Sequence, residues 1–531
     1  MRSQWQTSED RLKLLKELVK QDSITNSEGE VNFPFYIKRT LKQLEYFNKN
    51  ESHIKFIETY DHKNAVVALY RSHDIDDTII LMSHYDTVDT NDFGPFQSLA
   101  FDCDALNKAF QKNLDSFNDD QQSDIKSDKY LFGRGVMDMK SGLMMHLSLL
   151  EKAINESWPI NIILLTVPDE EVNSSGMRSA VNDLSDFIEQ ENLKLLLIMN
   201  GEPAFSQHPD DEQYYIYNGS IGKIMPSVFV YGKETHVGEP LKGLSANYLI
   251  SRINSEIEYN PLLTEQYKDE ISPLPVSLYM KDLKDEYNVQ TPFMAVSYYN
   301  VFLFEQSSAQ VFKKFNTIIE QTMKTCTNDL KLYYEELPPI KVITYEKLMQ
   351  SMIDKHGQSV VDKILNDTNL SDERLYAQEV IQQLLLLDNS NDYTVVTYLN
   401  PPYYPSVNSG QQKLIKSISK YAIKQMKKQF NRETQKIYYF NGISDLSYVN
   451  YTHEASDEHI YSSNTPGFGR TYDIPFDAMK KLKAPVINIG AFGKDAHQLT
   501  ERIDIKSVSE EVPYVLNKIF HKFFINFRLS K

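Results

Sequence analysis

The sequence predicts an α/β fold in which a mixed, mostly parallel sheet is flanked by helices and a smaller α+β domain is inserted. Three observations lead to this prediction. Short apolar runs typical of strands alternate with amphipathic helical patterns in the first part of the chain. Four apolar runs lead, directly or through a short turn, into a histidine or a carboxylate. After Glu202 the pattern changes to two strand–helix units with an antiparallel edge, which indicates a separate α+β layer.

The first part of the chain contains the early elements of the main domain. A helix is expected over residues 10–20, followed by a polar turn, a second helix and a strand over 64–70. Three further strands are expected at 78–82, 161–167 and 193–199. The stretch 89–129 differs because it is acidic and rich in Asn and Gln. We expect it to form a loop-like insertion.

The region after Glu202 contains the inserted domain, which we assign to residues 216–345. Its expected elements are strands at 223–231 and 294–303 and helices at 244–257 and 309–325. Residues 346–389 are charged and helical in pattern, and no role follows from their sequence. The main-domain pattern returns with a strand at 393–399, a helix at 412–429 and strands at 436–440 and 486–489. The main domain is therefore expected to comprise residues 1–215 and 390–531.

Metal-binding side chains follow the ends of the four apolar runs. These segments are Ser83-His84-Tyr85-Asp86, Pro168-Asp169-Glu170-Glu171, Asn200-Gly201-Glu202-Pro203 and Asp495-Ala496-His497. In open parallel sheets, ligands bind outside the carboxyl ends of the strands. Imidazole and carboxylate groups gathered there are the ligands that a pair of divalent metal ions needs. A glycine-rich turn, Gly133 to Gly142, adds Asp138 at the head of a helix, where its two oxygens can bridge two cations.

These segments resemble a known family in both their residues and their order. The family's motifs appear as Ser83 to Val88, Gly133 to Lys140, Thr166 to Glu171, Gly201-Glu202-Pro203 and Ala496 to Glu501. The chain resembles the zinc-dependent peptidases and deacylases that include glutamate carboxypeptidase, aminoacylase, peptidase T and succinyl-diaminopimelate desuccinylase. Within that family it is most similar to the arginine-utilisation subgroup. This similarity rests on Gly232 to Pro240, Pro401 to Pro405 and Gly442 to Tyr448.

The resemblance implies a fold, a cofactor and a set of ligands. The main domain would be a zinc exopeptidase-like catalytic domain, and the inserted domain would be its lid and dimerisation domain. His84 and Glu202 would hold one metal ion, Glu171 and His497 would hold the other, and Asp138 would bridge them. A nitrogen and oxygen ligand set without thiolate suits two Zn²⁺ per chain, with Co²⁺ or Mn²⁺ as replacements.

The resemblance also implies roles for four further residues. Glu170 would be the general base that moves a proton from water to the leaving nitrogen, and Asp86 would fix the tautomer of His84. His236 would be the lid histidine that stabilises the oxyanion or holds the substrate, often from the partner subunit of a homodimer. Asp445 stands where the family has a G-G-T/S-D motif, but the sequence here is Asn441-Gly442-Ile443-Ser444-Asp445, which departs from that motif. Its role therefore stays open between substrate binding and local turn capping.

Composition and charge exclude several classes of partner. The formal net charge is −17 and no long basic run is present, which argues against nucleic acid and anionic membrane as partners. The two cysteines are too few for a disulfide framework. The apolar runs are shorter than the roughly 20 residues needed to cross a bilayer. With no secretory pattern at its polar start, the chain is expected to be cytoplasmic.

Two functions from different classes remain open at this point. The first is a dinuclear zinc hydrolase that cleaves a peptide or N-acyl amide bond of a small amino-acid-derived substrate, in amino-acid catabolism. Aminopeptidase, carboxypeptidase and deacylase activities share this chemistry, and the sequence does not choose among them. The second is a non-catalytic family member that binds a metal or ligand as a regulatory protein. The intact ligand set and Glu170 favour the enzyme.

Overall fold

The computed structural model describes residues 3–526 apart from 73–74, 209–210, 212, 335–336, 338 and 389–392. The chain divides into two compact units. The first unit comprises Met1–Ser220, Val407–Tyr451 and Pro475–Lys531, and the second comprises Ile221–Ser406 and Thr452–Ile474. Among the described residues, no helix combines the length and the apolar character that a membrane-spanning segment requires.

The first unit is built on an eight-stranded sheet in the order β1-β2-β5-β3-β6-β18-β7-β17. The strands are Ile54–Glu58 (β1), Asn64–Tyr70 (β2), Asp77–His84 (β3), Asn161–Val167 (β5), Lys194–Asn200 (β6), Tyr214–Tyr217 (β7), Thr434–Ile437 (β17) and Val486–Asn488 (β18). The pairs β3–β5, β3–β6, β6–β18 and β7–β17 are parallel, whereas β1–β2, β2–β5 and β18–β7 are antiparallel. The predicted mixed, mostly parallel α/β sheet is therefore confirmed.

Helices cover both faces of this sheet. One core contains alternate strand residues, such as Val66 and Leu164, together with apolar side chains of the helices on that face. The helices that contribute most of these side chains are Ser8–Lys20 (α1), Glu28–Leu41 (α2), Lys140–Asn155 (α6), Lys413–Phe430 (α13) and Val512–Phe520 (α16). Because strand side chains alternate in direction, the intervening residues face the other side. There Ser175–Gln190 (α7) contacts β1, β2 and β5, and Phe476–Lys481 (α15) contacts α7.

The parallel strands end together at one edge of the sheet. His84, the last residue of β3, is level with Val167, the last residue of β5. Asn200, the last residue of β6, is level with Met82 on one side and with Asn488, the last residue of β18, on the other. The segments that follow these four strands therefore begin beside one another, as the sequence predicts.

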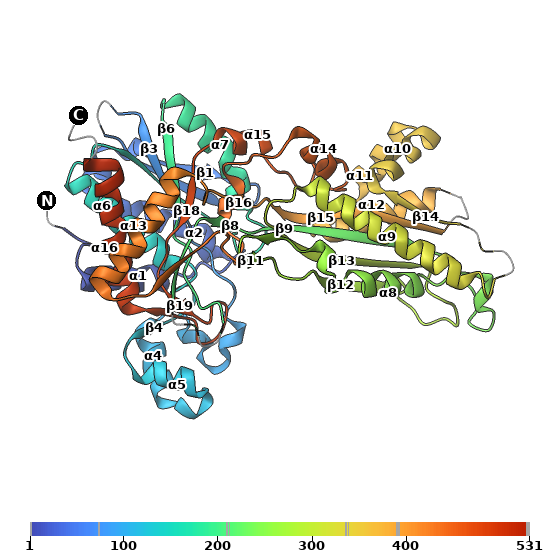
Figure 1. Cartoon of the computed structure of the whole chain (residues 1–531), viewed down its shortest axis with the longest axis horizontal. Helices are drawn as coiled ribbons and strands as arrows, with labels where there is room; N and C mark the ends of the chain where they lie inside the picture. The colour runs from blue at the N-terminus through green and yellow to red at the C-terminus, as the bar shows by residue number, and fades with distance from the viewer. Residues whose placement is uncertain are drawn as a thin grey trace. The chain divides into compact units, whose positions relative to one another are not determined.

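The stretch 89–129 is not loop-like, and this prediction was wrong. It contains Asn91–Leu99 (η2), Cys103–Lys112 (α4), Leu114–Ser116 (η3) and Asp119–Lys126 (α5). Phe93, Leu106, Phe110 and Phe117 form a small core that also includes Phe132 of Tyr130–Phe132 (β4). Figure 1 shows α4 and α5 grouped beside β4. β4 is one edge of a three-stranded sheet with Arg502–Asp504 (β20) and Gly493–Lys494 (β19).

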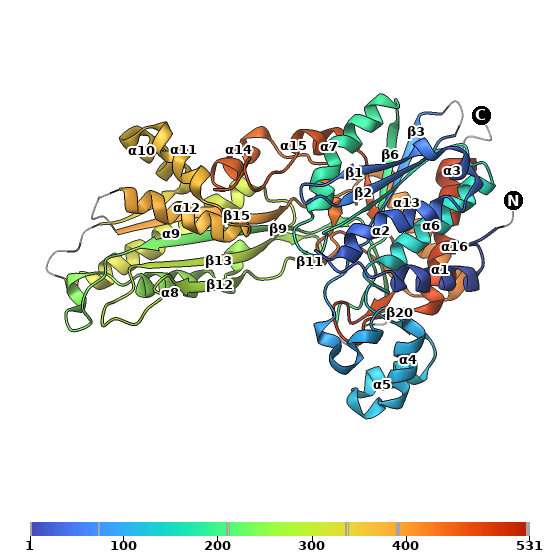
Figure 2. The ribbon, with the colours of Figure 1, turned by 180° about the vertical axis from the view of Figure 1, so that it is seen from behind.

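The second unit is an α+β layer around a five-stranded sheet in the order β12-β13-β9-β15-β14. The strands are Gly222–Tyr231 (β9), Val276–Asp282 (β12), Met294–Leu303 (β13), Ile340–Thr344 (β14) and Tyr393–Tyr404 (β15). Ala246–Ile257 (α8) and Ser308–Leu330 (α9) pack against each other and against the sheet. The other face carries Tyr345–His356 (α10), Gln358–Asp367 (α11) and Glu373–Leu387 (α12). Figure 1 places α9 in front of this sheet, and Figure 2 places α12 in front of it.

The two compact units differ from the predicted boundaries in three places. The expected strand at 393–399 is β15, which pairs with β9 and β14 in the second unit and not in the main domain. A buried apolar strand looks the same in either domain, so its sequence does not reveal its partners. The helical stretch 346–389 covers the sheet of the second unit, although residue 389 lies outside the described residues. Residues 452–474, with Ala455–Ser463 (α14) packed on α9, also belong to the second unit.

Candidate metal centre

Five side chains predicted as metal ligands meet at the carboxyl edge of the eight-stranded sheet. Asp138 lies between two histidines: its Oδ1 is 3.1 Å from Nε2 of His84, and its Oδ2 is 3.3 Å from Nε2 of His497. On the first side, Oε1 of Glu202 is 3.8 Å from Nε2 of His84. On the other side, Oε2 of Glu171 is 3.0 Å from Nε2 of His497. The five residues thus form two sets of donors that share one carboxylate.

The charge of this cluster fits bound cations. Burial raises the pKa of Glu202 well above its usual value, and the neighbouring Asp138 carboxylate raises it further. Burial and Asp138 also raise the pKa of Glu171 to about 7. Asp138, although buried, keeps a lowered pKa because both histidines donate hydrogen bonds to it. Buried carboxylates that crowd one another need positive charge, which two divalent ions would supply.

The donor atoms are also close enough for a metal ion. One atom each of His84, Asp138 and Glu171 lie within 4.8 Å of one another. The combined set offers imidazole nitrogens and carboxylate oxygens without a thiolate, which suits zinc and similar divalent metals. The residues therefore fit a dinuclear metal centre.

The turn that carries Asp138 is shaped by a glycine and a buried ion pair. Gly135 has a φ of 75°, and a Cβ at this position would lie 2.5 Å from Cγ2 of Thr87. Glu501 Oε1 accepts hydrogen bonds from the backbone N–H groups of Met137 (3.0 Å) and Asp138 (3.3 Å). Its other oxygen accepts from Nη1 of Arg134 at 2.9 Å. This arrangement fixes the backbone on which Asp138 stands.

Asp86 connects His84 with the loop that carries both glutamates. Its Oδ1 accepts a hydrogen bond from the backbone N–H of Glu170 (3.1 Å), and its Oδ2 accepts one from the N–H of Glu171 (3.2 Å). Nδ1 of His84 is 3.1 Å from the backbone oxygen of Asp86 and 3.4 Å from its Oδ1. Both oxygens face the ring nitrogen, so the backbone carbonyl shares the orienting contact that the sequence assigns to the carboxylate.

Glu170 and Glu171 face different sides of the centre. Oε2 of Glu170 is 3.9 Å from Nε2 of His84, whereas Glu171 contacts His497. Burial raises the pKa of Glu170 well above its usual value; His84 opposes this rise, and Glu202 adds to it. Asp169, the residue before the pair, has a φ of 60°, which is uncommon for a residue other than glycine.

The remaining two candidates lie in different surroundings. Asp445 is buried in the first unit, and burial raises its pKa to about 7; His84 opposes this rise, and Asp86 adds to it. It therefore shares the acidic environment of the centre. His236 belongs to the second unit, where it is exposed and its Nδ1 accepts a hydrogen bond from the backbone N–H of Gly238 at 3.1 Å.

Sequence reasoning missed a buried ion pair behind the glutamate loop. Oε1 of Glu30 accepts a hydrogen bond from the N–H of Asp169 (2.9 Å), and Nζ of Lys63 lies 2.9 Å from Oε2 of Glu30. Lys63 Nζ is also 3.6 Å from Oδ1 of Asp169. Glu30 and Lys63 both lie in polar sequence near turns. No hydrophobic periodicity there indicates that these two side chains are buried.

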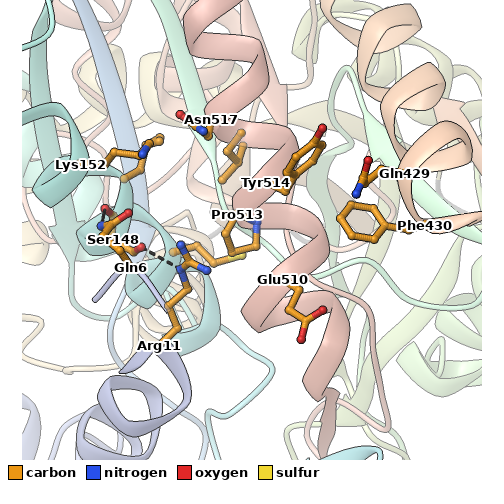
Figure 3. A pocket seen from close by; sticks show the side chains of 13 residues that line it. Gln6, Arg11, Ser148, Lys152, Gln429, Phe430, Glu510, Pro513, Tyr514 and Asn517 are labelled. Atoms are coloured by element: carbon orange, nitrogen blue, oxygen red, sulfur yellow. Dashed lines mark hydrogen bonds between the residues drawn. The ribbon is translucent and has the colours of Figure 1, made fainter. Parts of the chain in front are cut away.

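A separate pocket in the first unit contains none of these residues (Figure 3). It has a volume of about 350 Å³ and is lined by residues of α1, α6, α13 and α16. Arg11 lines it, but its Nε donates to Oγ of Ser148 (3.0 Å) and its Nη1 donates to the backbone oxygen of Ser509 (2.8 Å). The guanidinium of Arg11 thus links α1 to α6 and to the C-terminal segment, and these contacts give Arg11 a structural role.

Comparison with known proteins agrees with this architecture. Residues 80–517 match the family described as "Peptidase family M20/M25/M40". Among curated proteins, YqjN of Bacillus subtilis is 34% identical over 97% of this chain and 96% of its own length. RocB of the same species is 30% identical over 92% of this chain and 90% of its own length.

Solved structures share the fold at low sequence identity. The metallo-carboxypeptidase Sso-CP2 from Sulfolobus solfataricus has a TM-score of 0.55 and 13% identity, covering 96% of this chain and 98% of its own. A tripeptidase from Staphylococcus aureus has a TM-score of 0.52 and 13% identity, covering 98% of this chain and all (100%) of its own. At such identities the likeness shows the fold alone.

Proposed function

Because this chain belongs to peptidase family M20/M25/M40, we propose that it is a dinuclear metal-dependent hydrolase that cleaves an amide bond of a small amino-acid-derived substrate. The observation that carries the proposal is the position of Asp138. One of its oxygens faces His84 and the other faces His497, as a carboxylate that bridges two metal ions requires. The resemblance to the arginine-utilisation subgroup favours a role in amino-acid catabolism.

The residues around the centre have different roles in the proposed hydrolysis. His84 and Glu202 would hold one Zn²⁺, Glu171 and His497 would hold the other, and Asp138 would join them. When bound, the two ions supply Lewis acidity that polarises a carbonyl and acidifies water. Glu170 takes the proton from the attacking water and returns it to the leaving nitrogen. Its carboxylate, with Oε2 3.9 Å from Nε2 of His84, lies beside the centre at which water would be activated.

Two residues are assigned to the substrate. Asp445, buried among the same carboxylates, is the candidate contact for a positively charged group of the substrate. His236 is the candidate donor to the oxygen on which negative charge develops as the carbonyl is attacked. A homodimer through the second unit would allow the partner subunit to supply this histidine.

Hydrolysis assays test the proposal. Zinc-loaded and cobalt-loaded protein should cleave at least one member of a panel of dipeptides and N-acyl amino acids, and the products should identify the activity as aminopeptidase, carboxypeptidase or deacylase. Chelation of the metal should abolish cleavage, and added zinc should restore it. If the metal-loaded protein binds members of the panel but cleaves none, the hydrolase proposal is wrong and the non-catalytic regulatory function is supported.

Substitution of Asp86 by asparagine should weaken metal binding by about 10–100-fold, the usual effect of losing a residue that orients a ligand. The amide keeps the shape of the side chain but presents an N–H₂ group to one of the two backbone N–H donors of Glu170 and Glu171. Competition with a chromogenic chelator measures the affinity. Thr25→Val is the comparison variant: it removes a hydroxyl that lies 2.9 Å from Oδ2 of Asp86 and 3.1 Å from the backbone oxygen of Thr87, and it should keep the affinity because Asp86 retains both backbone N–H bonds. Equal affinities for wild type and Asp86→Asn would remove Asp86 from this role.

Substitution of His236 by alanine should reduce turnover by about 10²–10³-fold, the range for loss of one oxyanion donor, while metal content stays normal. Steady-state kinetics and metal analysis of the purified variant check this result. Co-expression of His236→Ala with Glu170→Gln chains tests the source of the histidine. Recovered activity in the heterodimer would show that the partner supplies it, and no recovery would show that each chain supplies its own. Wild-type turnover by His236→Ala would exclude it from the mechanism.

A further inference from the structure

A fully buried arginine links α5 of the 89–129 segment to the loop that carries the last metal ligand. Nε of Arg502 donates to Oδ2 of Asp124 (2.8 Å), and its Nη2 donates to Oδ2 of Asp120 (2.8 Å); both aspartates lie on α5. Nη1 of the same guanidinium donates to Oδ2 of Asp495 and to the backbone oxygen of Thr500 (3.0 Å). One planar cation therefore joins the helix to both ends of the loop 495–500.

Lys494 and Gln121 add further contacts between α5 and this loop; Nζ of Lys494 lies 3.1 Å from Oδ1 of Asp120. Nζ of Lys494 donates to Oδ2 of Asp124 at 2.9 Å, and Nε2 of Gln121 donates to Oγ1 of Thr500 at 2.9 Å. Oγ1 of Thr500 in turn donates to Oδ2 of Asp495 at 2.7 Å. The helix thus contacts the loop on both sides of its tip.

The tip of the loop adopts a backbone conformation that needs such support. Asp495 has a φ of 58° and His497 has a φ of 60°, both in the left-handed region that residues other than glycine rarely adopt. Such residues keep this conformation only where the surrounding structure fixes them. The side chain of His497 is 47% exposed, so its own packing does little to hold it.

The same segment supports the Asp138 turn by a second set of contacts. Nη2 of Arg134 donates to Oδ1 of Asp92 (2.6 Å) in η2, while its Nη1 donates to Glu501. Because Glu501 holds the turn, this second contact acts on the bridging carboxylate. Asp124 and Arg502 act on the other loop. The two effects can therefore be separated by substitution.

We propose that the 89–129 segment is a positioning element of the metal centre, and that Asp124 and Arg502 fix the imidazole of His497 for the metal position that it shares with Glu171. This inference rests on the proposed function, since it presupposes two metal positions. It gives the 89–129 segment a role in metal affinity. Asp124 and Arg502 are positioning residues, because they act through the loop and contact no metal ligand side chain.

Zinc titration of metal-free protein tests the inference with Asp124→Asn. The variant should bind two zinc ions per chain, one with wild-type affinity and one about 10–100-fold more weakly, because the orientation of one ligand is lost. Asp104→Asn is the matched control: Asp104 lies on α4 of the same segment, and its exposed carboxylate pairs with Lys16 and not with the loop. The control should keep both affinities. Circular dichroism and thermal unfolding confirm that each variant is folded.

The outcomes separate this inference from the proposed function. A wild-type chain that binds fewer than two zinc ions contradicts the proposed function itself. A wild-type chain with two ions and an Asp124→Asn variant with unchanged affinities overturns only the positioning role. Equal weakening of both positions also overturns it, because a general loss of stability would act on both. Should Asp124→Asn fail to fold, Asp120→Asn tests the link between α5 and the loop more mildly, because it removes the charge that faces Nη2 of Arg502 and Nζ of Lys494 while the pair between Asp124 and Arg502 stays in place. It should weaken the same single position by a smaller factor than Asp124→Asn, and unchanged affinities in this variant would overturn the positioning role.

Discussion

Replacement of Glu170 by glutamine should lower turnover by about two to four orders of magnitude, the contribution of general acid–base catalysis, without loss of metal. Glutamine has the shape of glutamate but accepts no proton at neutral pH. The backbone N–H of residue 170 keeps its bond to Asp86, so the loop geometry is retained. Single-turnover kinetics and metal analysis of the purified variant measure the two quantities.

Glu171→Gln is the matched control for this experiment. The neighbouring glutamate faces His497 at 3.0 Å and would ligate metal, so its substitution should deplete one metal position. Two results would contradict the assignment of Glu170. One is near-normal turnover of Glu170→Gln, and the other is a loss of metal as large as that of Glu171→Gln.

Replacement of Asp138 by alanine should abolish binding at both metal positions and remove all detectable turnover. A single carboxylate faces both histidines, so its loss withdraws one ligand from each ion and leaves two cations without the anion between them. His84→Ala and His497→Ala should instead each leave one position partly filled. Zinc stoichiometry of the three purified variants decides between the two patterns. If all three lose one ion alike, Asp138 does not bridge.

The sequence was most informative where strands end. The segments after β3, β5, β6 and β18 each carry a histidine or carboxylate, and parallel neighbours in register bring such ends together. The positions of His84, Glu171, Glu202 and His497 could therefore be predicted from motif and topology alone. Asp138 could be predicted because a turn between glycines at the head of a helix points its side chain inward.

Other features depend on contacts between distant parts of the chain. The 89–129 segment is polar in composition, yet its helices gather around Phe93, Phe110 and Phe117, with Phe132 added from β4. Polar composition alone suggested a loop, because the few aromatic residues are widely spaced. Arg502 follows the last family motif, and no sequence pattern marks it. Only the fold shows that its guanidinium donates a hydrogen bond to Asp124 of α5, which lies 378 residues earlier in the chain.

In the inserted domain, too, the sequence does not reveal which strands pair. β15 is buried along its whole length, which fits a central strand of either sheet. Its pairing with β9 and β14 follows from tertiary packing, and the sequence therefore misplaced the boundary near residue 390. The strand and helix types of this domain were nevertheless correct for β9, β13, α8 and α9, because their periodicity is strong.

The central claim is that this chain holds two metal ions joined by Asp138. Anomalous diffraction from crystals of the zinc-loaded wild-type chain, recorded on both sides of the zinc absorption edge, tests it most directly. The account predicts two zinc peaks per chain, about 3.5–4 Å apart, with one oxygen of Asp138 at each peak. A single peak at this edge of the sheet, or two peaks that do not share Asp138, would contradict it.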